Sequence, residues 1–194
     1  MPNYCENELS IYGKREDLQK FKAVAQGENG CLDMNSFIPY PVEYRNQDEI
    51  CRVFREEIEE HNRKITEKMK QMSQEEKEQL WKDNNESWGI KGPDGYNCGG
   101  YEWCCDNWGT KWNFCDPCLV VEDLDEEDGY LFYEFATAWS PPVPVIKKMG
   151  EKFPQLIFEL RYFEGSMQFN GILRIENGEI VDEDCAAYYG HRGG

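Results

Sequence analysis

Residues 130–175 read YLFYEFATAWSPPVPVIKKMGEKFPQLIFELRYFEGSMQFNGILRI. The segment 130–138 carries aromatic residues on both faces of an extended chain, which predicts a strand inside a sheet. Ser140 follows as an N-cap, with prolines in the first helical turn. The next apolar residues recur at helical spacing up to Pro154, and they are Val145, Ile146, Met149 and Phe153. A strand and a helix are therefore predicted in succession.

The remainder of this stretch reads as a pair of strands. Segments 156–163 and 167–175 are joined by a turn, and Asn177-Gly178 offers a second tight hairpin to a short strand at 180–181. The order is β-α-β-β with a further strand. We expect residues 130–183 to form a ferredoxin-like unit.

The start of the chain predicts a strand and a helix. Cys5, Leu9 and Ile11 alternate with polar residues over 4–12, as in a strand with one buried face, and Asn7 on that face needs a hydrogen-bond partner. Residues 14–26 then repeat apolar residues at helical spacing and stop at Gly27. The chain opens β-α.

A helical insertion is predicted at 48–82, after a loop at 27–47. The helix 48–72 has one apolar stripe among charged faces, and Ser73 to Glu76 form a capping box that starts a short helix with Leu80 and Trp81. We expect the stripe to pack on the rest of the domain or on a second copy of the chain. The stripe comprises Ile50, Phe54, Ile58, His61, Ile65, Met69 and Met72.

Together these elements predict one α+β domain over residues 1–194. The order β-α-(insertion)-β-α-β-β fits a ferredoxin-like antiparallel sheet with helices on one face. Residues 83–121 show no regular pattern. The acidic run Glu122 to Gly129 is expected to be a solvated loop, because its carboxylates repel one another.

Composition narrows the class of protein. The 194 residues include 38 acidic and 21 basic ones, for a net charge of −17, which disfavours direct binding of a phosphate backbone and favours basic protein partners. No apolar run approaches the roughly 18 residues of a membrane span, and the first residues do not resemble a signal peptide. A cytoplasmic protein is expected.

Three strings of residues resemble a known family. They are Met1-Pro2-Asn3-Tyr4-Cys5-Glu6-Asn7, Asn107-Trp108-Gly109-Thr110-Lys111-Trp112-Asn113 and Thr137-Ala138-Trp139-Ser140-Pro141-Pro142, followed by Pro144 and Phe153-Pro154. With these strings the chain resembles the YubB-like family of phage-, prophage- and plasmid-borne proteins. The resemblance implies a ferredoxin-like C-terminal domain and an origin in a mobile element, and it carries over no catalytic residue.

Several of the nine cysteines are candidate metal ligands. Cys115 and Cys118 have the spacing with which two thiolates chelate one tetrahedral zinc ion, and Cys98 and Cys104 would complete the set. Two other interpretations stay open. The cysteines can be small buried hydrophobic residues, or Cys115 and Cys118 can form a redox pair.

A group of tryptophans with one lysine is the candidate ligand site. Trp108, Lys111, Trp112 and Trp139 could line a groove for a planar or anionic ligand, with Trp108 and Trp112 on one face if their segment is helical. The alternative is that the tryptophans fill the core and the lysine stem covers their rings.

No catalytic constellation is recognisable in the sequence. Its two histidines, His61 and His191, lie apart from any nucleophile or metal-binding pattern, so we do not expect an enzyme. The first hypothesis is an interaction protein of a mobile element that binds a host or element protein, in a sharper form by imitating DNA. The alternative is a protein that binds a small ligand or nucleotide signal at the tryptophans.

Overall fold

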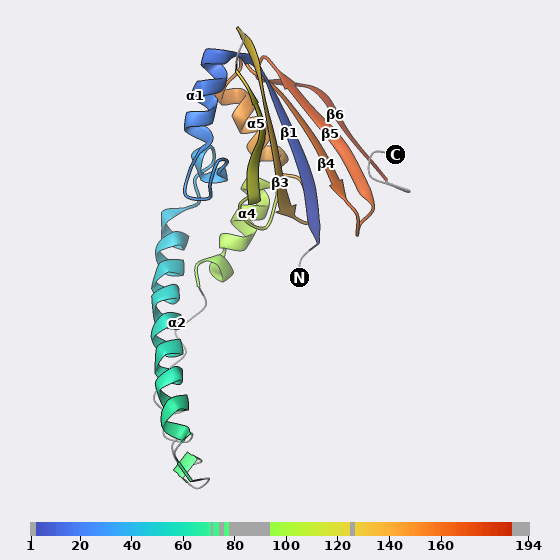
Figure 1. Ribbon diagram of the computed structural model, residues 1–194. Coiled ribbons are helices and arrows are strands. Elements are labelled where there is room, and N and C mark those ends of the chain that lie inside the picture. The colour runs from blue at the N-terminus through green and yellow to red at the C-terminus, as the bar shows by residue number, and fades with distance from the viewer. Residues whose placement is uncertain (1–2, 71, 74–75, 78–93, 125–126, 188–194) are drawn as a thin grey trace. The chain divides into compact units, whose positions relative to one another are not determined.

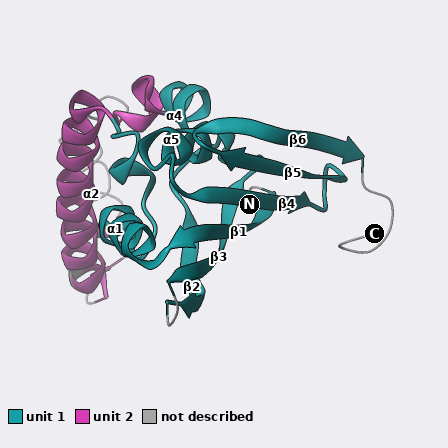
Figure 2. Cartoon of the chain, turned by 90° about the horizontal axis from the view of Figure 1, so that it is seen from above, with its two compact units in different colours: residues 1–40, 101–194 teal, residues 41–100 magenta. Residues whose placement is uncertain are grey.

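The computed structural model describes residues 3–70, 72–73, 76–77, 94–124 and 127–187. The chain divides into two compact units, residues 1–40 with 101–194 and residues 41–100 (Figure 2). The second unit contains the insertion predicted at 48–82 and extends beyond it in sequence at both ends.

The first unit is built on a six-stranded antiparallel sheet (Figure 1). Its strand order is β2-β3-β1-β4-β5-β6, so β3 has the interior position that its aromatic residues predicted. The strands are β1 Tyr4–Lys14, β2 Cys115–Asp123, β3 Asp128–Ala138, β4 Ile157–Glu164, β5 Phe169–Glu176 and β6 Glu179–Ala187.

Two helices cover one face of this sheet, α1 (Arg15–Ala25) and α5 (Val143–Lys152) (Figure 1). Alternate strand residues point toward the helices and are buried, as the period of a strand requires. We call this side the helix-covered face and the other side the open face. Fully buried residues of the core include Leu9, Ile11, Leu18, Phe21, Leu131, Tyr133, Ile146, Met149, Phe158 and Leu160.

Six elements of this unit follow a known order. In sequence they are β1-α1-β2-β3-α5-β4, which is the β-α-β-β-α-β order of ferredoxin-like folds, and β5 and β6 extend the sheet. The α+β ferredoxin-like fold predicted from the sequence is therefore confirmed.

The acidic run departs in part from its prediction as a loop, since its ends lie in strands whereas Leu124 and Glu127 do not. Glu122 and Asp123 end β2, and Asp128 and Gly129 begin β3. Glu122 is held by Lys22 of α1, whose Nζ lies 2.6 Å from its carboxylate. Pairing with the interior strand β3 thus outweighs the repulsion among the carboxylates.

Two boundaries near α5 also differ from prediction. The helix begins at Val143 with Pro142 at its N-cap, and Ser140 instead donates a hydrogen bond of 2.6 Å to the Gly109 carbonyl. Strand β5 begins at Phe169 rather than at 167, because the buried Glu164 carboxylate accepts a bond of 3.1 Å from the Ser166 amide and holds the turn.

The sequence predicts one glycine in a hairpin turn and one at the end of a helix. Asn177 and Gly178 have φ of 53° and 77°, as expected of the predicted two-residue hairpin, which joins β5 to β6. Gly27 does not end α1 in a left-handed conformation. That helix ends at Ala25, and Gly27 forms an isolated bridge with Gly30.

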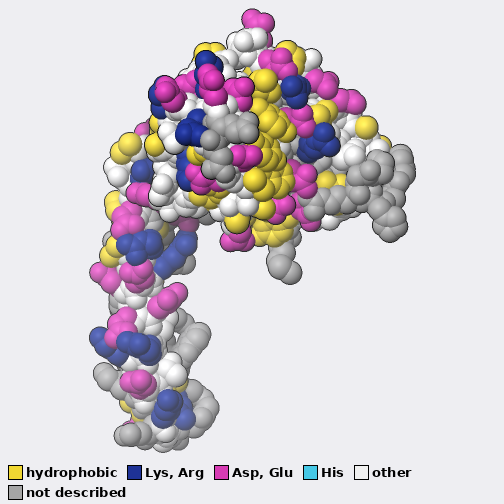
Figure 3. Space-filling model, turned by 45° about the horizontal axis from the view of Figure 1, so that its top comes forward, with side chains coloured by type: hydrophobic (Ala, Val, Ile, Leu, Met, Phe, Trp, Pro, Cys, Tyr) yellow, Lys and Arg dark blue, Asp and Glu magenta, His cyan; other side chains and the backbone are white. Residues whose placement is uncertain are grey.

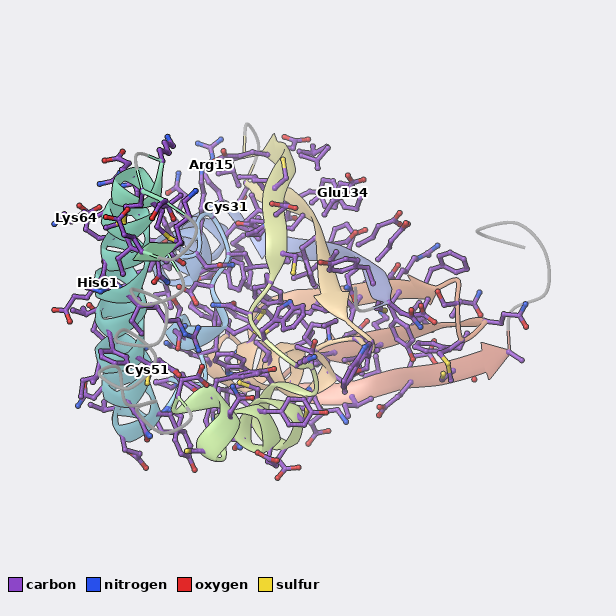
Figure 4. All side chains as sticks on the ribbon, turned by 90° about the horizontal axis from the view of Figure 1, so that it is seen from below. Arg15, Cys31, Cys51, His61, Lys64 and Glu134 are labelled. Carbon is purple, nitrogen blue, oxygen red and sulfur yellow. The ribbon has the colours of Figure 1, made fainter. Side chains whose placement is uncertain are left out.

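The second unit is dominated by α2 (Val42–Met69), which begins six residues earlier than the predicted position 48. Its exposed side carries ion pairs along the helix, such as Glu49 with Arg52 at 2.6 Å. In Figure 4, the labelled residues Cys51, His61 and Lys64 lie on this helix. The stripe is half-buried from Phe54 to Met69, but Ile50 is 59% exposed.

The short helices are η1 (Met34–Ser36), η2 (Tyr96–Cys98) and α4 (Gly100–Trp108). Within the second unit, η2 is tied to α2, because the Tyr96 amide donates to Asp48 at 2.8 Å. The predicted capping box is present, since Ser73 and Glu76 exchange hydrogen bonds. Leu80 and Trp81 lie outside the described residues. Within the described part of the chain, no helix has the length and apolar character to cross a membrane.

Candidate binding site at the junction of three motifs

The three strings that carry the family resemblance meet at the end of β3. The Trp139 amide donates to the Asn3 carbonyl at 2.9 Å, and the Thr110 hydroxyl donates to the Ala138 carbonyl at 2.9 Å. Residues far apart in sequence thus share one hydrogen-bonded junction.

Gly109 permits this close approach. Its φ is 74°, in the left-handed region, and a Cβ atom there would lie 2.6 Å from Cδ of Pro144. A larger residue would be strained by its backbone and would also meet a rigid ring. The glycine in the Asn107–Asn113 string is therefore required by packing.

Four side chains form a cluster at the junction, which we call the lysine cage. The Lys111 ammonium lies 4.6 Å from the ring centroid of Trp139, 5.1 Å from Trp112 and 5.8 Å from Tyr101. Tyr101 and Trp139 are nearly perpendicular, at 83°. Three of the four residues predicted for a ligand site are thus brought together.

Trp108 belongs to a different cluster. Its side chain is 4% exposed, its indole donates to the Ile38 carbonyl at 2.8 Å, and its ring packs against Tyr40 and Trp103. Because α4 ends at Trp108, Trp112 is not part of this helix, and the two tryptophans do not share a helical face. Trp108 is a core residue, as the alternative interpretation held.

Asn113 anchors the far end of the same string. Its Nδ2 donates to the buried Asp33 carboxylate at 2.7 Å, and its Oδ1 accepts from the Met34 amide at 3.0 Å. Burial alone would raise the pKa of Asp33, but bonds from Asn113, Asn35 and Asn29 outweigh it and leave the pKa below its ordinary value. The string is therefore fastened at both ends.

The open face carries a second group of aromatic residues. Tyr12 and Tyr130 stack with centroids 5.0 Å apart, and Tyr130 stacks on Phe132 at 6.3 Å. Tyr12 is 38% exposed and Val121 is also exposed. Figure 3 shows hydrophobic side chains gathered in a band on the face that it displays, with charged side chains on both sides. We call Tyr12, Tyr130, Phe132 and Val121 the aromatic band.

Carboxylates border the aromatic band. Glu8 lies opposite Glu134 across β1 and β3, and opposite Arg161 across β1 and β4. A hollow of about 710 Å³ lies beside them, lined in part by Glu6, Glu8, Arg161 and Asp184. In Figure 4, Glu134 lies on the opposite side of β2 from Cys31, as expected for the open and the helix-covered faces.

The four predicted zinc ligands are distributed over three elements. Cys98 is in η2 of the second unit, Cys104 is buried in α4, and Cys115 and Cys118 are on β2. Because the register of β2 shifts between Cys115 and Cys118, both cysteines pair with β3 residues of the open face, Ala136 and Glu134. Among the described residues, no three or more His, Cys, Asp or Glu side chains form a group that could hold a metal ion.

Some residues of these sites were not expected from the sequence. Tyr101 gave no signal, because its segment showed no periodicity. Tyr12 did carry one, since it lies at the end of the polar side of the first strand, where Glu6, Glu8 and Ser10 precede it. Together with Tyr130 and Phe132 it forms a contiguous aromatic group, and a contiguous apolar patch on a surface indicates a candidate binding site.

Comparison with known proteins supports the fold. No curated protein sequence matches the chain. The crystal structure of a protein api92 from Yersinia pseudotuberculosis is similar, with a TM-score of 0.50 and 11% identity, over 99% of this chain and 100% of that one. At this identity the likeness shows the fold alone. Residues 121–190 match the family model described as the ferredoxin-like domain in Api92-like protein, so the C-terminal part of this chain is similar to that domain.

Proposed function

We propose that the protein is a non-enzymatic interaction protein that binds a basic protein through the open face of its sheet. The observation that carries the proposal is the aromatic band bordered by carboxylates on a face that α1 and α5 leave uncovered. Tyrosine is among the residues that contribute most energy to protein interfaces.

Electrostatics supports a basic partner. Glu8 and Glu134 lie directly opposite each other, and like charges so placed destabilise a sheet. A lysine or arginine of the partner placed between them would offset this cost. The net charge of −17 would also speed the encounter with a positive surface.

Exposed aromatic residues on a sheet also occur in proteins that stack RNA bases. The carboxylates beside this band would repel the phosphates of a nucleic acid, however. A protein partner is therefore favoured over direct contact with nucleic acid.

An origin in a phage, prophage or plasmid, implied by the family resemblance, is part of this proposal. The partner would then be a host or element protein. In the sharper form, the carboxylates imitate phosphates and occupy the groove of an enzyme that grips nucleic acid. Duplex DNA should then compete with the protein for that partner.

A comparison of two double variants tests the proposal. Glu8→Gln with Glu134→Gln removes two charges from the open face, and Glu59→Gln with Glu67→Gln removes two from exposed positions of α2. A partner captured from host lysate at low salt should be lost by the first variant and kept by the second. Capture should also fall steeply as salt rises.

Equal capture by both variants would exclude the open face as the binding surface. Glu8→Gln relieves the like-charge pairing with Glu134 but also removes the pairing with Arg161 on β4, so the stability of the first variant is measured alongside capture. Loss of capture can therefore be separated from loss of folding by a thermal unfolding curve.

The second candidate function is binding of a small ligand at the tryptophans. Its support is the convergence of Lys111, Trp112 and Trp139 in the lysine cage. The faces of these rings hold an ammonium group, however, so a planar ligand would find its stacking surfaces occupied.

A further inference from the structure

The lysine cage has the arrangement with which proteins bind cations through aromatic rings. Tyr101, Trp112 and Trp139 each present a ring to the Lys111 ammonium, at 5.8, 5.1 and 4.6 Å from their centroids. Ring faces are electron-rich and attract a cation within about 6 Å, and several rings around one point form the aromatic cages that bind quaternary and methylated ammonium groups.

The walls of the cage are held by contacts that do not involve the lysine. The Trp139 amide is bonded to the Asn3 carbonyl at 2.9 Å, and the Trp112 indole donates to Cys115 Sγ at 3.1 Å. Trp139 has a φ of 71°, an unusual backbone conformation for a bulky residue that the junction maintains. Removing the Lys111 side chain should therefore leave an open cage.

The cage can be reached from solvent. Trp139 is 42% exposed, and Tyr101, Lys111 and Trp112 are half-buried. The lysine enters the cage on a flexible four-carbon stem, so it can leave without a change in the backbone. The acidic chain around it attracts cations and repels anions.

We infer that the lysine cage is a binding site for a methylated or quaternary ammonium group, with Lys111 as an internal ligand that the external cation displaces. A primary ammonium is compact and strongly hydrated, so it gives up much hydration energy to lie among rings. A methylated ammonium is less hydrated and fills the space between the rings, so it gains more from the same site. The inference concerns different residues from those of the aromatic band and does not depend on the function proposed for the open face.

The first test is a titration of the unaltered protein with tetramethylammonium chloride, followed by NMR. The methylene protons of Lys111 next to the ammonium should be shielded by the rings and should move toward their ordinary shifts as the lysine is displaced. Sodium chloride at the same ionic strength should not cause this change. Unchanged Lys111 shifts at the highest tetramethylammonium concentration would contradict displacement.

The second test removes the internal ligand. Lys111→Ala should bind tetramethylammonium at least ten-fold more tightly than the unaltered protein, as measured by quenching of tryptophan fluorescence. Lys152→Ala is the matched control, because it removes an equal charge whose ammonium lies 5.5 Å from a single ring, that of Phe37. Its affinity should equal that of the unaltered protein.

Two further measurements identify the interaction. Choline should bind Lys111→Ala more tightly than its neutral analogue 3,3-dimethyl-1-butanol, since only choline carries a charge for the rings to attract. Adding Trp139→Leu to Lys111→Ala should abolish the gain. Equal binding of choline and its neutral analogue, or no gain in a folded Lys111→Ala protein, would overturn the inference.

Discussion

Tyr12 of β1 and Tyr130 of β3 are direct cross-strand neighbours, and their rings stack 5.0 Å apart with an interplanar angle of 25°. The pair lies on the open face, where neither α1 nor α5 covers it. An aromatic pair so placed adds little to the core but offers a flat apolar surface to a partner.

Truncating one of these tyrosines should separate stability from binding. Tyr12→Ala should lower the free energy of unfolding by about 1 kcal/mol, the usual magnitude for an exposed cross-strand aromatic pair. It should at the same time abolish capture of a partner by the open face. Urea unfolding measures the first effect and the capture assay the second. A loss of several kcal/mol would mean that Tyr12 serves the fold.

Asp33 should make the free energy of unfolding depend on pH below a pH of about 4. The pKa of Asp33 is lowered in the folded protein, so its contribution is complete above the unfolded value of about 4 and is lost as pH falls through the folded value. At pH 7, Asp33→Asn should cost about 1–3 kcal/mol, as expected when hydrogen bonds to a buried carboxylate are disrupted.

The gap between Asp33→Asn and the unaltered protein should narrow below pH of about 4, where the unaltered carboxylate also becomes protonated. Urea unfolding at neutral and acid pH gives both values. Glu59→Gln on the exposed side of α2 is the control and should behave as the unaltered protein. A gap that stays constant with pH would show that the carboxylate charge is not what Asn113 stabilises.

Tyr133→Phe should be neutral or stabilising. The Tyr133 hydroxyl is buried and has no hydrogen-bond partner among the described residues, and burial raises the pKa of this phenol. Removing an unpartnered polar atom should therefore raise the free energy of unfolding by up to about 1 kcal/mol. Marked destabilisation, measured by urea unfolding, would imply that the hydroxyl has a partner such as a bound water.

The cysteines should differ in reactivity. Burial, with a smaller effect of the Glu164 carboxylate, raises the pKa of Cys5 to about 12, and Cys5 is fully inaccessible. A thiol reagent at neutral pH should modify the exposed Cys98, Cys118 and Cys185 first. Peptide mass spectrometry after timed labelling checks the order. Early labelling of Cys5 without unfolding would show that β1 opens locally.

Local patterns in the sequence were sufficient for most elements of the first unit. Alternation over 4–12 and 130–138, helical spacing from Val145 to Phe153 and the Asn177-Gly178 turn each depend on neighbouring residues, and each predicted its element to within a few positions. Strand β2 was not predicted, because Pro117 and the acidic residues at its end have a low intrinsic preference for strands. Its pairing with β3 supplies the stability that its own residues do not.

The candidate site was also predicted in part from local sequence and decided in part by the tertiary structure. The sequence by itself indicated an acidic surface and identified Lys111, Trp112 and Trp139, because their chemistry is uncommon in so acidic a chain. Only the tertiary structure separated Trp108 from them, added Tyr101 and placed Tyr12 beside Tyr130. The physical reason is that these relationships join residues far apart in the chain. They depend on strand register and on hydrogen bonds such as Trp139 to Asn3, which no local pattern encodes.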